Sequence, residues 1–263
     1  MAESLTHVAF FGVTGGAVFN CLKQALLDES IHCYVLVRDT DKLKNLLRNS
    51  MGDPPYAFSH RLLVVKGDIV DIDVVVSTLF PARRTWDPVD VIVYGVSGFK
   101  LDINTEGNSI TDAEICTYGV DIIEEATLKG YESYHYGIPY HYPRFVAIGT
   151  LGIGAAFRNT SSAQIEALKP SYDWFIESGA YEDKILMEEI ISHRDFQGLF
   201  RNTLIVRPGF LTNNAPFGLN SIRVGTRNIP PLGYTISRDN LGCWLYQHGI
   251  LGNMTGVILV TGP

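Results

Sequence analysis

The first 150 residues alternate short apolar runs with longer amphipathic ones, and this alternation restricts the fold more than any other feature. Five runs rich in β-branched residues predict strands, at 7–11, 33–37, 61–66, 89–94 and 144–148. The stretches between them predict helices, at 17–28, 41–48, 71–79 and 110–129. Nearly continuous apolar strands separated by helices form a parallel sheet covered on both faces. We therefore expect a Rossmann-like, doubly wound α/β fold.

The remaining residues are less regular and carry weaker signals. A helix is expected at 181–193 and a strand at 203–206, followed by loops rich in proline and glycine. No linker-like composition separates the two halves, so we expect one domain over residues 1–263. The segments 131–145 and 208–240 are expected to form a small, irregular substrate-binding region over the sheet.

Composition excludes several classes of function. Of the 263 residues, 46% are hydrophobic and 19% are charged, which is ordinary for a globular protein with a sizeable core. The net charge of -7 argues against a nucleic-acid partner, because phosphate backbones are bound by surplus basic residues. No apolar run approaches the roughly 20 residues that span a bilayer. The scattered cysteines and histidines predict neither a disulfide framework nor a metal site. Without a signal-peptide pattern, we expect a cytoplasmic protein.

A glycine turn, GVTGGAVF at residues 12–19, connects the first strand to the first helix. Gly12 permits a tight turn and Gly15 lets the backbone approach a pyrophosphate at the helix N-terminus. In the dinucleotide-binding fingerprint a third glycine follows, where it allows close packing of the helix on the strand. Val18 stands at that position, so we expect looser packing there. The turn alone fits a phosphate site and a ligand-free turn about equally well.

Arg38 ends the second strand and bears on the choice of cofactor. In dinucleotide sites an acidic residue at this point bonds the ribose 2′-hydroxyl of NAD, whereas an arginine accommodates the 2′-phosphate of NADP. Arg38 therefore favours NADP(H). Two alternatives stay open: a surface arginine that pairs with Asp39 or Asp41, and an NAD site that uses Asp39.

The chain resembles the atypical short-chain dehydrogenase/reductases, specifically the NmrA-like NAD(P)-binding family. The similarity runs in order from about residue 7 to 260 and rests on the segments GVTGG, LVRDTDKL, VVKGDIVD, RFVAIGTLGIG, YEDKILMEEII, NTLIVRPGFLTNN and YTISRDNLGCWL. The resemblance and the strand ends together imply a cofactor site made of Gly12, Thr14, Gly15, Gly16, Ala17, Val18, Arg38, Asp68, Ile69, Gly95, Val96, Ser97, Gly149, Lys184, Pro208 and Gly209.

Ordinary members of the wider family catalyse with a serine, a tyrosine and a lysine. Lys184 fits the lysine, but Ala180 stands four residues earlier, where the tyrosine is expected. Tyr181 lies three residues before the lysine, and Thr150 or Gly149 aligns with the serine. Lys184 is thus a cofactor-binding catalytic lysine, a member of an adapted pair with Tyr181, or a surface residue paired with Glu188 at i+4.

A tyrosine-rich segment at 131–145, YESYHYGIPYHYPRF, suggests an aromatic wall. Aromatic side chains bind flat, bulky or cationic ligands by stacking and cation–π contacts. We expect substrate contacts from Tyr134, Tyr136, Tyr140, Trp174 and Phe210. A tyrosine-rich surface loop and a homodimer contact are equal alternatives.

The function expected from this resemblance is NADP(H)-dependent reduction of a bulky aromatic small molecule, such as an imine, iminium, enone or carbonyl of the natural-product type. The family includes fungal enzymes of indole-alkaloid biosynthesis that join redox chemistry to a Diels–Alder-type cyclisation, so a cyclase is a finer expectation. The alternative from another class is a redox sensor that binds NADP(H) without turnover and regulates a protein partner. The missing tyrosine agrees with both.

Overall fold

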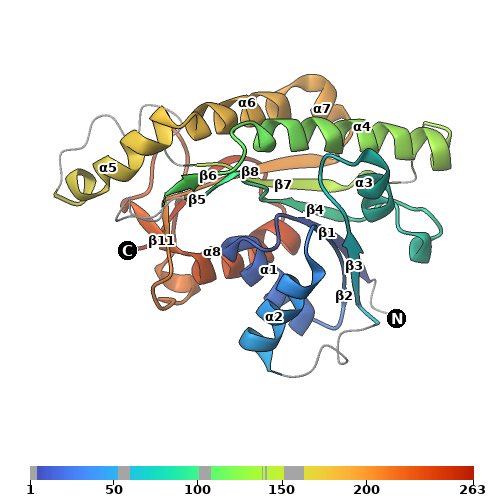
Figure 1. The fold of residues 1–263 in the computed structure, drawn as a ribbon, viewed down its shortest axis with the longest axis horizontal. Coiled ribbons are helices and arrows are strands. Elements are labelled where there is room, and N and C mark those ends of the chain that lie inside the picture. Colours follow the sequence, from blue (N-terminus) through green and yellow to red (C-terminus); the bar gives the residue numbers. More distant parts are fainter. Residues whose placement is uncertain (1–4, 53–59, 101–107, 138, 140, 151–162) are drawn as a thin grey trace.

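A twisted sheet of eight strands forms the centre of the computed structural model, which describes residues 5–52, 60–100, 108–137, 139, 141–150 and 163–263. The strand order is β10-β12-β8-β7-β4-β1-β2-β3 (Figure 1). Seven strands run parallel: β1 (Thr6–Phe11), β2 (Ile31–Val37), β3 (Leu62–Lys66), β4 (Val91–Tyr94), β7 (Arg144–Ile148), β8 (Asn202–Pro208) and β12 (Gly256–Thr261). The edge strand β10 (Arg223–Gly225) is antiparallel to β12.

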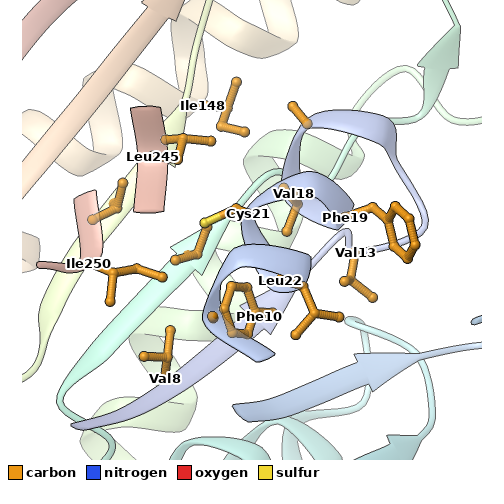
Figure 2. Packing of buried hydrophobic residues seen from close by; sticks show 14 of the residues in the cluster. Val8, Phe10, Val13, Val18, Phe19, Cys21, Leu22, Ile148, Leu245 and Ile250 are labelled. Carbon is orange, nitrogen blue, oxygen red and sulfur yellow. The ribbon is translucent and has the colours of Figure 1, made fainter. Parts of the chain in front are cut away.

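Helices cover both faces of this sheet (Figure 1). On one face lie α1 (Gly16–Leu27), α2 (Thr40–Met51), α8 (Arg238–Trp244) and the π-helical turn η5 (Leu245–Ile250). On the other face lie α3 (Ile72–Leu79), α4 (Ile115–His135), α6 (Ala180–Ser192) and α7 (Arg194–Gly198). Figure 2 shows part of the first core cluster, in which side chains of α1 meet those of β1 and η5. The fold class expected from the sequence is confirmed.

Shorter elements lie near the carboxyl ends of the strands. They include helix α5 (Ala163–Glu177), the antiparallel pair β5 (Phe99–Lys100) and β6 (Ser109–Ile110), and the parallel pair β9 (Phe210–Thr212) and β11 (Thr235–Ser237). Two 3-10 turns, η2 (Ala82–Arg84) and η4 (Leu219–Ser221), complete the described elements. No helix in the described part of the chain is long and apolar enough to cross a membrane.

Helix α4 begins five residues later than the sequence suggests, and a distant side chain sets its start. The buried carboxylate of Asp183, on α6, accepts backbone N–H groups from Cys116 (3.0 Å) and Thr117 (2.8 Å) in the first turn of α4. These N–H groups have no partner within their own helix, so the carboxylate stabilises that end. Asp183 therefore ties α6 to α4 and stabilises the start of α4.

Candidate functional site

A cavity of about 690 Å³ opens at the carboxyl ends of the parallel strands. Its walls include residues that follow β1, β2, β3, β4, β7 and β8, so six strand ends face one space. The strand order reverses between β1 and β4, and ligands in doubly wound folds bind at such a switch point. Every residue that the sequence predicts to bind the cofactor lines this cavity.

The glycine turn forms the floor of the cavity beneath the start of α1. Gly12 has φ +80°, a left-handed conformation that favours glycine, and a Cβ there would overlap the backbone at Gly95. The N–H of Gly15 donates to the Gly12 carbonyl at 3.0 Å, which closes the turn. Gly15 is the N-cap of α1, and no side chain caps this helix. The turn therefore presents backbone N–H groups and a positive helix end to the cavity, as an anionic group requires.

Val18 does not loosen the packing of α1, contrary to the expectation from the sequence. Its side chain is buried, and a Cβ on Gly95 would overlap the Val18 Cγ2 atom. The same Cβ would lie 3.1 Å from Ile148 Cδ1. Val18 and Ile148 both belong to the cluster in Figure 2. The fingerprint places a glycine at position 18 so that α1 can pack closely on the sheet. Here Gly95, just after β4, lacks the side chain instead, and the close packing is kept.

The end of β2 carries two cations. Arg38 lines the cavity, is 79% exposed and lies 3.9 Å from the Asp68 carboxylate, so it pairs with neither Asp39 nor Asp41. Asp39 instead caps α2, because its Oδ1 accepts N–H groups from Asp41 (3.0 Å) and Lys42 (2.9 Å). Asp39 is absent from the cavity wall, which removes the acidic residue that an NAD site would use. Lys42, in the first turn of α2, also lines the wall. It is not among the predicted cofactor residues, although its position just after the Asp39 cap indicates a place near the end of β2.

Lys184 lies at the opposite end of the cavity, on α6. It is 4% exposed, and its Nζ donates to the carbonyls of Ile148 (3.0 Å) and Val96 (3.4 Å). The interpretation of Lys184 as a solvated residue paired with Glu188 is therefore wrong. Glu188 forms a buried ion pair with Arg207, whose Nη2 lies 2.7 Å from Oε2.

Glu188 supports the backbone behind Lys184. The Thr150 N–H donates to its carboxylate, and a Cβ on Gly149 would overlap Oε1, so glycine at 149 lets the carboxylate approach. Burial raises the pKa of Glu188, although the hydrogen bonds and charge of Arg207 oppose this rise. Thr150 and Gly149 both line the cavity, as the sequence predicts.

Tyr181 does not line the cavity. Its ring packs edge-on against Phe175 (5.8 Å between centroids) and Tyr172 (6.3 Å) of α5. These two α5 residues line the cavity, together with Phe99 and Phe210. The prediction of Tyr181 as a member of the catalytic set is therefore not supported by its position, whereas Phe210 does reach the cavity. The described wall does not include Trp174 either, so the substrate contact expected from it stays a prediction.

The described tyrosines of the segment 131–145 do not line the cavity. Tyr134 stacks on Trp86 with 4.8 Å between ring centroids, and Tyr136 is 99% exposed. Neither lines the cavity, and Tyr140 lies outside the described residues. The reason is topological: this segment leads into β7 and so lies at the amino edge of the sheet, while the cavity is at the carboxyl edge. The aromatic wall of the cavity comes instead from Phe99, α5 and β9.

The described residues contain no group of His, Cys, Asp or Glu side chains that could hold a metal ion. The cavity instead combines an uncapped helix start over a glycine turn, two cations at one end and a buried lysine beside aromatic rings at the other. This donor set fits an elongated, phosphorylated dinucleotide, and the aromatic rings fit an apolar ligand.

Comparison with known proteins gives full-length relatives. No family model matches the chain. Reductase pytE from Aspergillus terreus is 30% identical over 255 residues, which are 94% of this chain and 93% of that protein. Oxidase pynE from Aspergillus niger is 28% identical over 268 residues, covering 93% of this chain and 92% of the relative. A wide-type short-chain dehydrogenase/reductase from Veillonella parvula, solved in complex with NADP, has the same fold (TM-score 0.64, 12% identity, 98% and 95% of the two chains).

Proposed function

Because this chain belongs to the atypical short-chain dehydrogenase/reductase family of oxidoreductases, we propose that it is an NADP(H)-dependent reductase of a bulky aromatic small molecule. The observation that carries the proposal is the continuity of the cavity. One space extends from Arg38 and Lys42, past the glycine turn, to Lys184 and the rings of Phe99 and Phe210.

The cofactor would lie along the carboxyl edge of the sheet. Arg38 and Lys42 would contact the 2′-phosphate, the N–H groups at the start of α1 would contact the diphosphate, and Lys184 would contact the nicotinamide ribose. The proposal for NADP(H) over NAD(H) is supported by the capping role of Asp39, whose carboxylate oxygen is held by backbone N–H groups. When bound, the cofactor supplies or accepts a hydride.

The residues beside Lys184 limit the chemistry. Tyr181 packs against the rings of α5 and lies outside the described cavity wall, which supports a reduction that takes no proton from a tyrosine. At this end of the cavity, the family pattern assigns catalytic roles to two described polar side chains, Lys184 and Thr150. An iminium carbon that receives a hydride becomes a neutral amine and needs no proton at the reacting atom. A ketone oxygen and the nitrogen of a neutral imine do need one, so we favour an iminium, or an imine that binds in its protonated form, over a simple ketone.

The aromatic wall supports a flat, bulky substrate. The ring centroids of Phe99 and Phe175 lie 5.1 Å apart. Tyr172 and Phe210 extend the same wall. Such walls bind aromatic ligands through area and ring geometry, with few polar groups. The finer form of the proposal is that reduction precedes a Diels–Alder-type cyclisation in fungal alkaloid biosynthesis, where the same wall would hold the reduced product folded.

The position of Tyr181 also favours a second candidate, a sensor that binds NADP(H) without turning it over. Turnover separates the two functions. Purified protein would be mixed with NADPH and a panel of cyclic imines, iminium salts, enones and ketones, and absorbance of the reduced nicotinamide followed. Oxidation of NADPH with at least one imine or iminium is expected. Tight NADPH binding with no oxidation across the panel would favour the sensor.

The cofactor choice has its own test. Arg38→Ala and Lys42→Ala should each weaken NADPH binding about 5- to 10-fold, because each removes an exposed charge-assisted contact of about 1–1.5 kcal/mol. NADH affinity should change by less than about twofold. Lys44→Ala is the matched control, since Lys44 is exposed, pairs with Asp41 at 3.2 Å and lies outside the cavity wall. Equal losses for NADPH and NADH would place these cations elsewhere than at the 2′-phosphate.

A further inference from the structure

Arg238 brings a cation from the C-terminal part of the chain to the glycine turn. It is the first residue of α8, and α8 packs along α1. Two glycines allow this approach: a Cβ on Gly242 would overlap Asn20, and a Cβ on Gly16 would overlap Arg238 Cδ and lie 3.3 Å from its Cβ and Cγ. The aliphatic stem of Arg238 therefore crosses directly over Gly16, and Arg238 itself lines the cavity.

The guanidinium of Arg238 is held in place by the opposite rim. Its Nη1 donates to the Leu211 carbonyl at 3.1 Å and to the Asn213 side-chain oxygen at 2.9 Å. Both of these acceptors are neutral oxygens, so neither of the two bonds itself offsets the positive charge. Leu211 and Asn213 also line the cavity. The head group is thus anchored on the β9 side of the cavity, while the aliphatic stem of Arg238 crosses Gly16.

We propose that Arg238 is a ligand of the cofactor diphosphate, contacting the phosphate oxygens over Gly15 and Gly16. This proposal rests on the proposed function, because it needs a dinucleotide in the cavity. The start of α1 supplies a charge of only about +0.5, against the two negative charges of a diphosphate. The first turn of α1 adds no basic residue, and Lys23 further along the helix pairs with Asp239 at 3.6 Å.

The neighbouring cations serve other parts of the cavity. Arg38 and Lys42 follow β2, at the end where the 2′-phosphate would lie. Lys184 is hydrogen-bonded to carbonyls at the other end, and Lys100 lies on β5, next to Phe99. Arg238 is in contact with the glycine turn itself. A guanidinium fork complements adjacent phosphate oxygens better than a point charge does. Arg238 thereby gives the site a phosphate contact from outside the fingerprint.

The test is a calorimetric titration of the full-length protein with fragments of the cofactor, so no turnover is needed. Two probes separate the phosphates: 2′-phospho-ADP-ribose contains the diphosphate, and adenosine 2′-monophosphate lacks it. Arg238→Gln should weaken NADPH and 2′-phospho-ADP-ribose about 10- to 100-fold, as expected for a hydrogen-bonded charge. It should change the affinity for adenosine 2′-monophosphate less than about twofold.

Arg223→Gln is the matched control, because Arg223 also donates from Nη1 to a backbone carbonyl (Leu232, 3.1 Å) but lies outside the cavity wall. It should bind all three probes like the wild type. If Arg238→Gln does not fold, Arg238→Lys, which keeps the charge and loses the fork, should show a smaller loss confined to the two diphosphate probes.

The outcomes separate the two proposals. A wild-type protein that binds neither NADPH nor 2′-phospho-ADP-ribose refutes the proposed function. A wild type that binds them, with unchanged affinities in Arg238→Gln, refutes the role of Arg238 alone. An equal loss for all three probes would also refute it, because a purely structural effect of Arg238 on the rim would not distinguish a diphosphate from a monophosphate.

Discussion

Replacing Gly95 by alanine tests whether this glycine substitutes for the one missing at position 18. The new Cβ would overlap Val18 Cγ2 and lie 3.1 Å from Ile148 Cδ1. Val18 cannot move aside easily, because it is buried in a helix, where a β-branched side chain has one strongly preferred rotamer. Overpacking of this kind costs about 1–3 kcal/mol of unfolding free energy.

The double variant makes this prediction specific. Val18→Ala alone removes two buried methyl groups, which costs about 1.6 kcal/mol in transfer free energy and more if a cavity remains. In Gly95→Ala/Val18→Ala the new methyl occupies part of the space that the valine vacates. The cost of Gly95→Ala should then nearly vanish, giving a coupling free energy of about 1–3 kcal/mol between two residues in contact.

Urea unfolding of the four proteins gives this coupling from the midpoints and slopes. In thermal unfolding, each kcal/mol should shift Tm by about 2–4 °C for a domain of this size. Gly198→Ala is the control, because a Cβ there would meet nothing within 4 Å and Gly198 lies in α7. Effects of Gly95→Ala and Val18→Ala that add within about 0.5 kcal/mol would refute the reasoning.

Three further perturbations address the rest of the molecule. Lys184→Met should lower NADPH affinity about tenfold while the protein stays folded, and an unchanged calorimetric titration would leave Lys184 a structural role only. Arg207→Met should lower the free energy of unfolding in urea by about 3–5 kcal/mol, because it leaves the Glu188 carboxylate buried without its ion-pair partner. The double variant Arg207→Met/Glu188→Leu should lose much less. Equal losses in the two variants would contradict this account. Burial lowers the pKa of His7 to about 4, so the unfolded chain takes up a proton between about pH 6.5 and 4 while the folded protein does not. The stability that His7 contributes is therefore complete above about pH 6.5 and is lost as pH falls toward 4, by about 1–2 kcal/mol for a half-exposed ring. In His7→Gln, the free energy of unfolding should depend less on pH across this window. An unchanged pH dependence would assign it to other groups.

The fold could be predicted from local patterns, because the parallel strands are apolar runs in the sequence. The loops that line the cavity follow those runs directly. Helix α5 was missed, since Pro170 reads as a helix breaker although the helix continues through it. The two rings that α5 contributes to the cavity were missed with it. The face of α6 that holds Asp183, Lys184 and Glu188 is buried, but each of these charges has a partner on another element, which no local pattern reveals.

The candidate site was predictable wherever a residue follows a strand. The same rule would have excluded the tyrosine-rich segment, because a stretch that leads into a strand lies at the opposite edge from one that leaves it. The exchange between Val18 and Gly95 and the contact between Gly16 and Arg238 join positions far apart in the chain. A single sequence carries no signal for such pairs, so only the structure shows them.

The packing of α8 on α1 also has a consequence for how the protein is made. The glycine turn is translated long before Arg238 and strand β12, which pairs with β8. The rim over the turn therefore cannot close until Arg238 and the rest of α8 have been synthesised. A ligand that binds only the closed site would stabilise chains that include α8 against unfolding, and it would not stabilise chains that stop before α8.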